Sequence, residues 1–203
     1  MTFDQIPSDG IIEKTKQALV SNGINVEIVE TGADAKKRAL KLIPEGAEVM
    51  TMSSKTLEEI DLVKDINDSG KYNSARNALM KFNREIDYIK MQKLGAAPEY
   101  AVGSVHAVTQ DGKVVIASNS GSQLPGYVYG SNKVILVVSA KKIVDNLDEA
   151  FKRIYDYVLP LESERVKKAY GMPHSNVSKL LIINKEINPE RIVLILVKED
   201  LGF

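Results

Sequence analysis

Residues 133–138 read KVILVV, in which one lysine is followed by five apolar residues without a polar interruption. A strand with one face in water alternates apolar and polar side chains, whereas a strand covered on both faces favours a continuous apolar run. The stretch therefore predicts an interior strand of a parallel sheet. Residues 47–51 (AEVMT) lie between two helical patterns and predict a second interior strand of the same sheet.

Outward from these two strands, helical and extended patterns alternate along the chain. Apolar residues at three- and four-residue spacing predict helices, and period-two or continuous apolar runs predict strands. The helices fall at 9–21, 33–43, 56–63, 79–93 and 147–159, the last ended by Pro160, and further strands fall at 24–30, 180–184 and 191–197. Residues 124–129 predict one or two helical turns. This alternation indicates an α/β protein with a mostly parallel sheet flanked by helices.

One stretch departs from the alternation. SVHAVTQDGKVVIAS (104–118) has two β-rich runs around Asp111-Gly112, a dipeptide that favours a tight hairpin turn. We therefore expect the mostly parallel sheet to carry one antiparallel hairpin. With 203 residues, 44% of them hydrophobic, the chain can bury roughly two thirds of its unfolded surface around one core. This predicts a single domain, 1–203.

Charge and hydropathy narrow the classes of partner. Lys and Arg together number 27, as do Asp and Glu, and neither sign forms a long block, so a polyanion has little basic surface to bind. No apolar run approaches the ~20 residues that a bilayer crossing needs, and residues 1–10 lack the regions of a signal peptide. We expect a cytoplasmic protein with no nucleic acid or membrane partner.

The residue types available for chemistry are also limited. The chain has no cysteine, which excludes disulfides, thiolate metal sites and a cysteine nucleophile. His106 and His174 are far apart and have no metal-site spacing. The sequence therefore predicts no metal and no other cofactor, and it leaves oxygen and nitrogen groups to do any chemistry.

Two polar loops follow predicted strands and precede helical segments. MSSKT (52–56) offers the hydroxyls of Ser53, Ser54 and Thr56 beside Lys55, and NSGSQ (119–123) offers Asn119, Ser120, Gly121, Ser122 and Gln123. Ligands of parallel sheets bind at the carboxyl ends of strands, where helix N-termini favour anions. We expect the two loops to face each other across one cleft and to bind an anion. The alternative for each loop is an ordinary helix cap or a solvated turn.

Acid–base candidates are few. His106 is expected mid-strand in the hairpin, as a general base or as an ordinary strand histidine. Glu59 is the second candidate base, although Thr56 and Glu59 also fit a helix capping box. Lys141 and Lys142 could neutralise an anion, but a solvated pair is the simpler interpretation. His174 is expected in a loop without a role.

The stretch 104–154, with SVHAVTQDGKVV, a Ser/Gly/Asn loop and YGSNKVILVVSAKKIVDNLDEAFKRI, resembles the LUD-domain proteins of the lactate utilization protein C type. MSSKTLEEI is similar to the serine/threonine motif that precedes a helix in that family. The resemblance implies a fold related to ribose-5-phosphate isomerase and the CoA-transferases. It also implies that strand-end loops bind phosphorylated or acyl substrates.

The resulting hypothesis is a LUD-domain protein that binds a small anionic metabolite, a carboxylate or phosphate ester, in lactate utilization or related carbon metabolism. One alternative is an isomerase or acyl-transfer enzyme that uses Glu59 or His106 as general base. Another is a non-catalytic accessory subunit of an oxidoreductase complex. The protein partners to consider are accordingly a second copy of the chain, in a homodimer, or oxidoreductase subunits.

Overall fold

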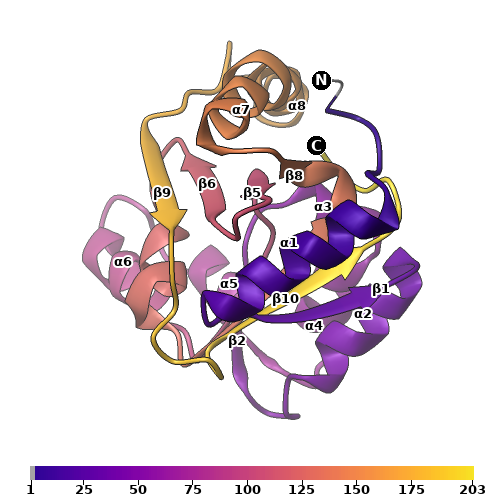
Figure 1. The fold of residues 1–203 in the computed structure, drawn as a ribbon. Coiled ribbons are helices and arrows are strands. Elements are labelled where there is room, and N and C mark those ends of the chain that lie inside the picture. Colours follow the sequence, from indigo (N-terminus) through magenta and orange to yellow (C-terminus); the bar gives the residue numbers. More distant parts are fainter. Residues whose placement is uncertain (1–2) are drawn as a thin grey trace.

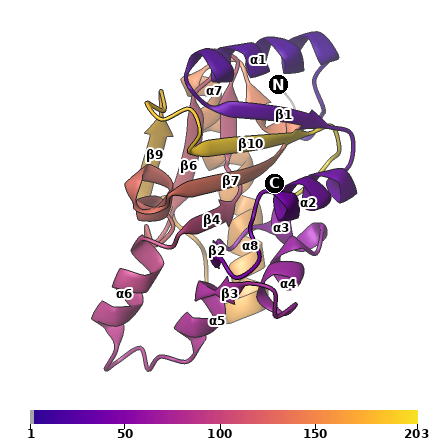
Figure 2. The same cartoon turned by 90° about the horizontal axis from the view of Figure 1, so that it is seen from below.

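The centre of the protein is a parallel sheet of six strands in the order β1-β10-β7-β4-β2-β3, as Figure 2 shows. The computed structural model describes residues 3–203. The strands are β1 (Asn25–Val29), β2 (Glu48–Thr51), β3 (Asn73–Ser74), β4 (Tyr100–Gly103), β7 (Lys133–Ser139) and β10 (Ile192–Val197). All neighbouring pairs are parallel. Both predicted interior strands are confirmed, because β7 lies between β10 and β4, and β2 between β4 and β3.

The predicted hairpin is also confirmed, but it belongs to a second sheet that the sequence pattern did not separate from the first. Its strands are β5 (Ala107–Thr109), β6 (Val114–Ser118), β8 (Ile143–Val144) and β9 (Lys179–Ile183), in the order β8-β5-β6-β9. Strand β6 runs antiparallel to both β5 and β9, whereas β8 is parallel to β5. Gly112 has a φ of +83° in the hairpin turn, a value that glycine adopts without strain.

Helices cover both sheets in layers (Figure 1). The helical segments are α1 (Asp9–Ser21), α2 (Gly32–Lys41), α3 (Lys55–Glu59), α4 (Leu62–Asn67), α5 (Ala75–Met80), α6 (Tyr88–Ala96), η1 (Gly126–Gly130), η2 (Ala140–Lys142), α7 (Leu147–Lys152), η3 (Arg153–Val158) and α8 (Leu159–Tyr170). Helices α2, α3 and α4 pack on one face of the large sheet, and α1 packs on the other face with the small sheet. Helix α7 and segment η3 cover the outer face of the small sheet. Within residues 3–203, no helix is both long and apolar enough to cross a membrane.

The core follows the alternation of side chains along the interior strands. In β7, Val134, Leu136 and Val138 point towards the small sheet, while Ile135 and Val137 point towards α2 and α3. Each of these side chains is fully buried, and full burial of such a side chain contributes about 1.5–3 kcal/mol. The continuous apolar run is thus explained by cover on both faces.

The single helix predicted at 79–93 is wrong, because the structure has two short helices, α5 and α6, separated by residues 81–87. In this break, Asn83 Oδ1 accepts a hydrogen bond from the Glu85 N–H at 2.9 Å, and Asp87 Oδ2 accepts from the Asn83 N–H at 3.3 Å. Asparagine side chains compete in this way with the helical pattern of backbone bonds.

The helix predicted at 56–63 is likewise divided, into α3 and α4. Asp61, between them, is the non-glycine residue with a positive φ, +55°, in the described part of the chain. This left-handed residue turns the chain, so that Leu57 and Leu62 can both be buried against the large sheet.

Pro160 does not end the helix predicted at 147–159. The chain continues from α7 through the π-helical segment η3 into α8, where Pro160 lies in the first turn. A proline inside a helix lacks the N–H and clashes with the carbonyl of the preceding turn. The wider turn of η3 just before Pro160 accommodates this clash, so the helix extends to Tyr170.

Candidate functional site

A cleft of about 250 Å³ opens where the carboxyl ends of β2, β4 and β6 meet the segment after β7. These strand ends supply Met52 to Thr56, Ser104 to His106, Ala117 to Gln123 (without Gly121) and Lys142. Side chains of α5, η3, α8, residues 175–177 and the C-terminal Phe203 complete the lining. The carboxyl ends of parallel strands are the usual place for a ligand in such a sheet.

The first polar loop begins α3 in a way that differs from the expected capping box. Ser54, not Thr56, is the N-cap, and its Oγ accepts a hydrogen bond from the Leu57 N–H at 3.4 Å. Thr56 is buried, and its Oγ1 accepts from Lys142 Nζ at 3.0 Å. The capping-box prediction was wrong because Thr56 points into the protein and binds a lysine far along the chain.

The second polar loop is held by its own hydrogen bonds. Ser118 Oγ accepts from the Gly121 N–H at 2.8 Å and donates to Gln123 Oε1 at 2.9 Å, and the hydroxyls of Ser120 and Ser122 lie 3.1 Å apart. Gly121 has a φ of +86°, and a Cβ at this position would lie 2.6 Å from Lys179 Cδ. Gly121 therefore determines the conformation of the loop. The group that lies close to its backbone is the side chain of Lys179.

The structure brings together most of the residues that the sequence singled out. The residues that line the common cleft are Ser53, Ser54, Thr56, His106, Asn119, Ser120, Ser122 and Gln123. Gly121 and Glu59 do not line it, and neither does His174, which is exposed. The two loops thus lie on one cleft, while their binding of a ligand stays a prediction.

His106 lies at the junction of the two sheets, just before β5, and not in the middle of a strand as expected. Its Nδ1 accepts a hydrogen bond from the Ala117 N–H at 3.1 Å, which leaves Nε2 to carry the proton of the neutral ring. Burial is the largest cause that lowers the pKa of His106 to about 3, and the neighbouring basic groups of Lys142 and Arg153 act in the same direction. The ring is therefore neutral at physiological pH.

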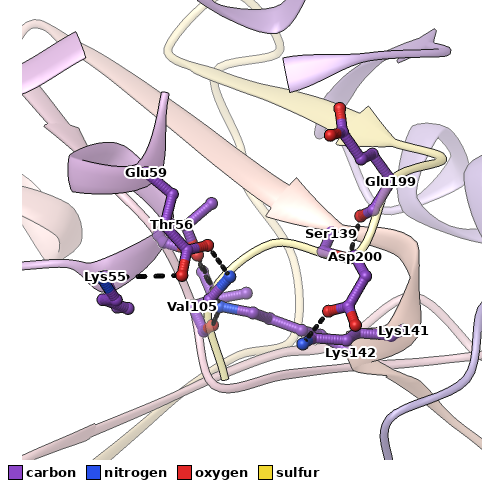
Figure 3. Close-up of polar contacts among 11 residues, drawn as sticks. Lys55, Thr56, Glu59, Val105, Ser139, Lys141, Lys142, Glu199 and Asp200 are labelled. Carbon is purple, nitrogen blue, oxygen red and sulfur yellow. Dashed lines mark hydrogen bonds and ion pairs between the residues drawn. The ribbon is translucent and has the colours of Figure 1, made fainter. Parts of the chain in front are cut away.

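Glu59 is held away from the cleft. Its Oε2 accepts a hydrogen bond from the Gly202 N–H at 2.6 Å, and its Oε1 lies 3.7 Å from Lys55 Nζ. The carboxylate thus links α3 to the C-terminal segment, as Figure 3 shows in part. This position does not suit a general base acting in the cleft.

Lys142 is a functional candidate that the sequence pattern did not indicate. Both lysines were expected in solvent, but Lys141 is 5% exposed and Lys142 is 2% exposed, so the solvated pair was wrong. Lys141 pairs with Asp200, whereas Lys142 lines the cleft, and Figure 3 shows its ammonium end beside Thr56 and Val105. Its Nζ donates to Thr56 Oγ1, Ser104 Oγ at 3.2 Å and the Val105 carbonyl at 3.1 Å. Its place after an interior strand was the signal available in the sequence.

Three arginines surround the cleft. Arg76 lines it and donates to Ser53 Oγ at 3.0 Å. Arg165 also lines it and is held by Glu162 through two hydrogen bonds of 2.7 and 2.8 Å. Arg153 is fully buried behind His106. The Nη1 of Arg153 donates a hydrogen bond to the His106 carbonyl at 2.5 Å. The Nε and Nη2 of Arg153 have no hydrogen-bond partner within residues 3–203.

The charges of the lining residues are unequal. Lys55, Arg76, Lys142 and Arg165 are basic, and among the described residues that line the cleft Glu162 is the one acid. No cluster of three or more His, Cys, Asp or Glu side chains suited to a metal occurs in residues 3–203. The site thus offers hydroxyls, amides and cationic groups to a ligand.

Together these features define an α/β protein with a small basic cleft at the carboxyl ends of β2 and β4 in the parallel sheet and of β6 in the second sheet. The model of the LUD domain family matches residues 12–197, and the chain therefore belongs to the LUD domain family. This confirms the family expected from the sequence.

Comparison with solved structures shows one related fold. A DUF162 family protein from Deinococcus radiodurans matches 94% of this chain and 99% of its own, with a TM-score of 0.57 and 11% identity; at that identity the likeness concerns the fold alone. A ribose-5-phosphate isomerase in complex with phospho-erythronic acid matches 84% of this chain and 96% of its own, with 13% identity and a TM-score of 0.42, which is too low to support an argument. No curated protein matches the chain.

Proposed function

We propose that this LUD domain protein binds a small anionic metabolite, a carboxylate or a phosphate ester, in the cleft between residues 52–56 and 119–123. The observation that carries the proposal is Arg76. Its guanidinium donates a hydrogen bond to Ser53 Oγ in the cleft lining, and within residues 3–203 no carboxylate forms an ion pair with it. An arginine in this state can give two charge-assisted hydrogen bonds to a carboxylate or phosphate.

Buried charge behind the cleft adds to the attraction. Arg153 is buried, and no carboxylate accepts a hydrogen bond from it within residues 3–203. A buried charge without a partner raises the free energy of the folded protein, and an anion nearby would lower it. In a cleft with low-dielectric walls, charges of one sign also concentrate their field on the ligand.

The size of the cleft supports a small ligand. Pockets for drug-sized molecules enclose roughly 300–1,000 Å³, and this cleft encloses about 250 Å³. The hydroxyls of Ser53, Ser120 and Ser122 can act as donors or acceptors, which suits the oxygens of a hydroxy acid or a sugar phosphate. We place the ligand in lactate utilization or related carbon metabolism, on the resemblance to lactate utilization proteins of the C type.

One observation favours the accessory subunit as a second candidate. Helices α5 and α6 extend from the end of the large sheet in Figure 2. On and between them, Met80, Ile86 and Ile89 are 72%, 80% and 66% exposed. Exposed apolar side chains close together are found at protein interfaces. Since α5 also carries Arg76, a partner there would lie beside the cleft.

A thermal-shift screen with matched pairs tests the proposal. Each carboxylate is compared with its amide, and each phosphate ester with its parent alcohol. An anion at about 100 times its Kd stabilises the folded state by about 2.7 kcal/mol, which raises the Tm of a protein of this size by roughly 5–10 °C. We expect such shifts from anions alone. Equal shifts from the neutral analogues, or no shift from any anion, would refute the proposal.

A further inference from the structure

Lys142 differs from an ordinary structural lysine in its partners. A buried ammonium group normally pairs with a carboxylate, because burial of an isolated charge is costly. Lys142 Nζ instead contacts two hydroxyls and one carbonyl, at 3.0–3.2 Å. Hydroxyls can donate as well as accept, so Thr56 or Ser104 can donate to the lone pair of a neutral amine while Val105 accepts from it. The same contacts therefore satisfy an uncharged Lys142.

The neighbours of Lys142 also oppose its charge. The guanidinium of Arg153 and the ammonium of Lys141 lie close enough to repel it, and burial removes the water that would stabilise the cation. Glu59 is the carboxylate that acts against these effects, but it is engaged by Lys55 and the Gly202 N–H. Together, burial and the two cations lower the pKa of Lys142 well below its ordinary value of 10.5. Desolvation and an adjacent cation are the two usual means of making a lysine nucleophilic.

We propose that Lys142 is an amine nucleophile that forms an imine with the carbonyl group of an anionic aldehyde or 2-oxo acid bound in the cleft. The inference rests on the proposed anion site and names its substrate class. The cations at the cleft lining hold the carboxylate or phosphate, and the carbonyl carbon lies over Nζ at the floor.

The step balances without a further reactant. The Nζ lone pair bonds to the carbonyl carbon, and the C–O π electrons move to the oxygen. A proton passes from nitrogen to that oxygen to give a carbinolamine. Protonation of the hydroxyl group then releases water as the C=N bond forms, which gives a protonated iminium. Loss of the remaining N–H proton returns the proton that was consumed, so amine and carbonyl become imine and water. The hydroxyls of Thr56 and Ser104 can relay these protons, since both contact Nζ.

His106 fits the same chemistry as a neutral donor. Because its Nδ1 accepts from the Ala117 N–H, its Nε2 carries a proton, and no residue within 3–203 accepts from that atom. His106 lines the cleft together with Lys142. A neutral imidazole can donate this proton to a developing oxyanion without adding a positive charge beside the amine.

The test is reductive trapping on the full chain with glyoxylate, the smallest aldehyde carboxylate, and sodium cyanoborohydride at pH 7, read by peptide mass mapping. A free lysine side chain, with a pKa of about 10.4, has about 0.04% neutral amine at this pH, and the exposed Lys168 and Lys185 are the reference sites within the same protein. We expect Lys142 to be alkylated at least about tenfold faster than these lysines, since its neutral fraction is larger. Glycolate has the same carboxylate but a hydroxymethyl group in place of the aldehyde, so it cannot form an imine. It should slow the labelling of Lys142 and of no other lysine.

Calorimetry of glyoxylate and glycolate binding separates the two proposals. Labelling of Lys142 that glycolate slows supports both. Binding of both acids without an adduct at Lys142 overturns the imine and leaves the anion site intact. Absence of binding together with labelling spread evenly over exposed lysines overturns both. The Lys142→Met variant serves to assign the adduct, and the result with the unaltered protein does not depend on its folding.

Discussion

His106 is held neutral by its surroundings, and this gives the stability of the protein a defined pH dependence. Its pKa is about 3 in the folded protein and 6.5 when unperturbed. Between these values the unfolded chain binds more protons at this position, so the free energy of unfolding falls as the pH falls below about 6.5. The slope from one such group is at most about 1.4 kcal/mol per pH unit.

We therefore expect His106→Asn to flatten the loss of stability between pH 6.5 and 5, measured by urea denaturation. Asparagine keeps an acceptor for the Ala117 N–H but does not titrate in this range. His174→Asn is the matched control, because His174 is exposed and lies outside the cleft. An unchanged pH profile in His106→Asn would show that the ring is not protected from protonation.

Substitution of Gly121 tests whether the conformation of the 119–123 loop contributes to the stability of the protein. Gly121→Ala should lower the free energy of unfolding by about 1–2 kcal/mol, because its φ is +86° and the new methyl group would meet Lys179 at 2.6 Å. Gly171→Ala is the matched control, with a φ of +68° and no heavy atom within 4 Å. The same loss in both variants would mean that the contact with Lys179 has no effect on stability.

Single residues also show where prediction from the sequence stopped. The hydroxyls and amides of both loops could be recognised because their types are suited to binding and they follow strands. The burial of Lys142 was missed, because the partners that surround its amine, Thr56, Ser104 and Val105, lie 86, 38 and 37 residues away. Two successive lysines look solvated until the fold places other segments around them.

At the scale of elements, strands were predicted more successfully than helix ends. A continuous apolar run such as 133–138 indicates a strand that is buried on both faces. This signal lies within the strand's own sequence. The ends of helices depend on competing local bonds, as at Asn83, and on packing, as at Asp61. The separation of the hairpin into a second sheet was not predictable, because β5 and β6 have the same apolar character as the strands of the large sheet.

The break between α3 and α4 provides a test at this scale. Asp61→Gly should stabilise the protein by about 0.5–1 kcal/mol, because a left-handed conformation is strained for a residue with a Cβ and free for glycine. Asp68→Gly, at the C-terminus of α4 with a φ of −111°, relieves no such strain and should be neutral or destabilising. Chemical denaturation of the two variants decides the matter, and equal effects would argue against strain at Asp61.

At the scale of the whole molecule, the cleft exists because the two sheets bring distant segments together. The carboxyl ends of β2 and β4 belong to the large sheet, while β6, which leads into the 119–123 loop, belongs to the small one. The segment after β7 crosses between the sheets and carries Lys142. The fold class and both loops could be predicted from the sequence. The basic character of the cleft could be seen only in the structure, because Arg76, Lys142 and Arg165 come from three separate elements.

The most direct test of the anion site is calorimetric titration of the anion with the largest thermal shift into three proteins: the unaltered chain, Arg76→Gln and Arg84→Gln. Arg84 is exposed and lies outside the cleft, so its variant makes the same change of charge elsewhere. Arg76→Gln loses a charge-assisted hydrogen bond worth about 1.5–3 kcal/mol, so its affinity for the anion should be roughly ten- to a hundredfold lower than that of the unaltered protein. The affinity of Arg84→Gln should be close to that of the unaltered protein. Equal affinities in all three proteins would contradict the proposed site.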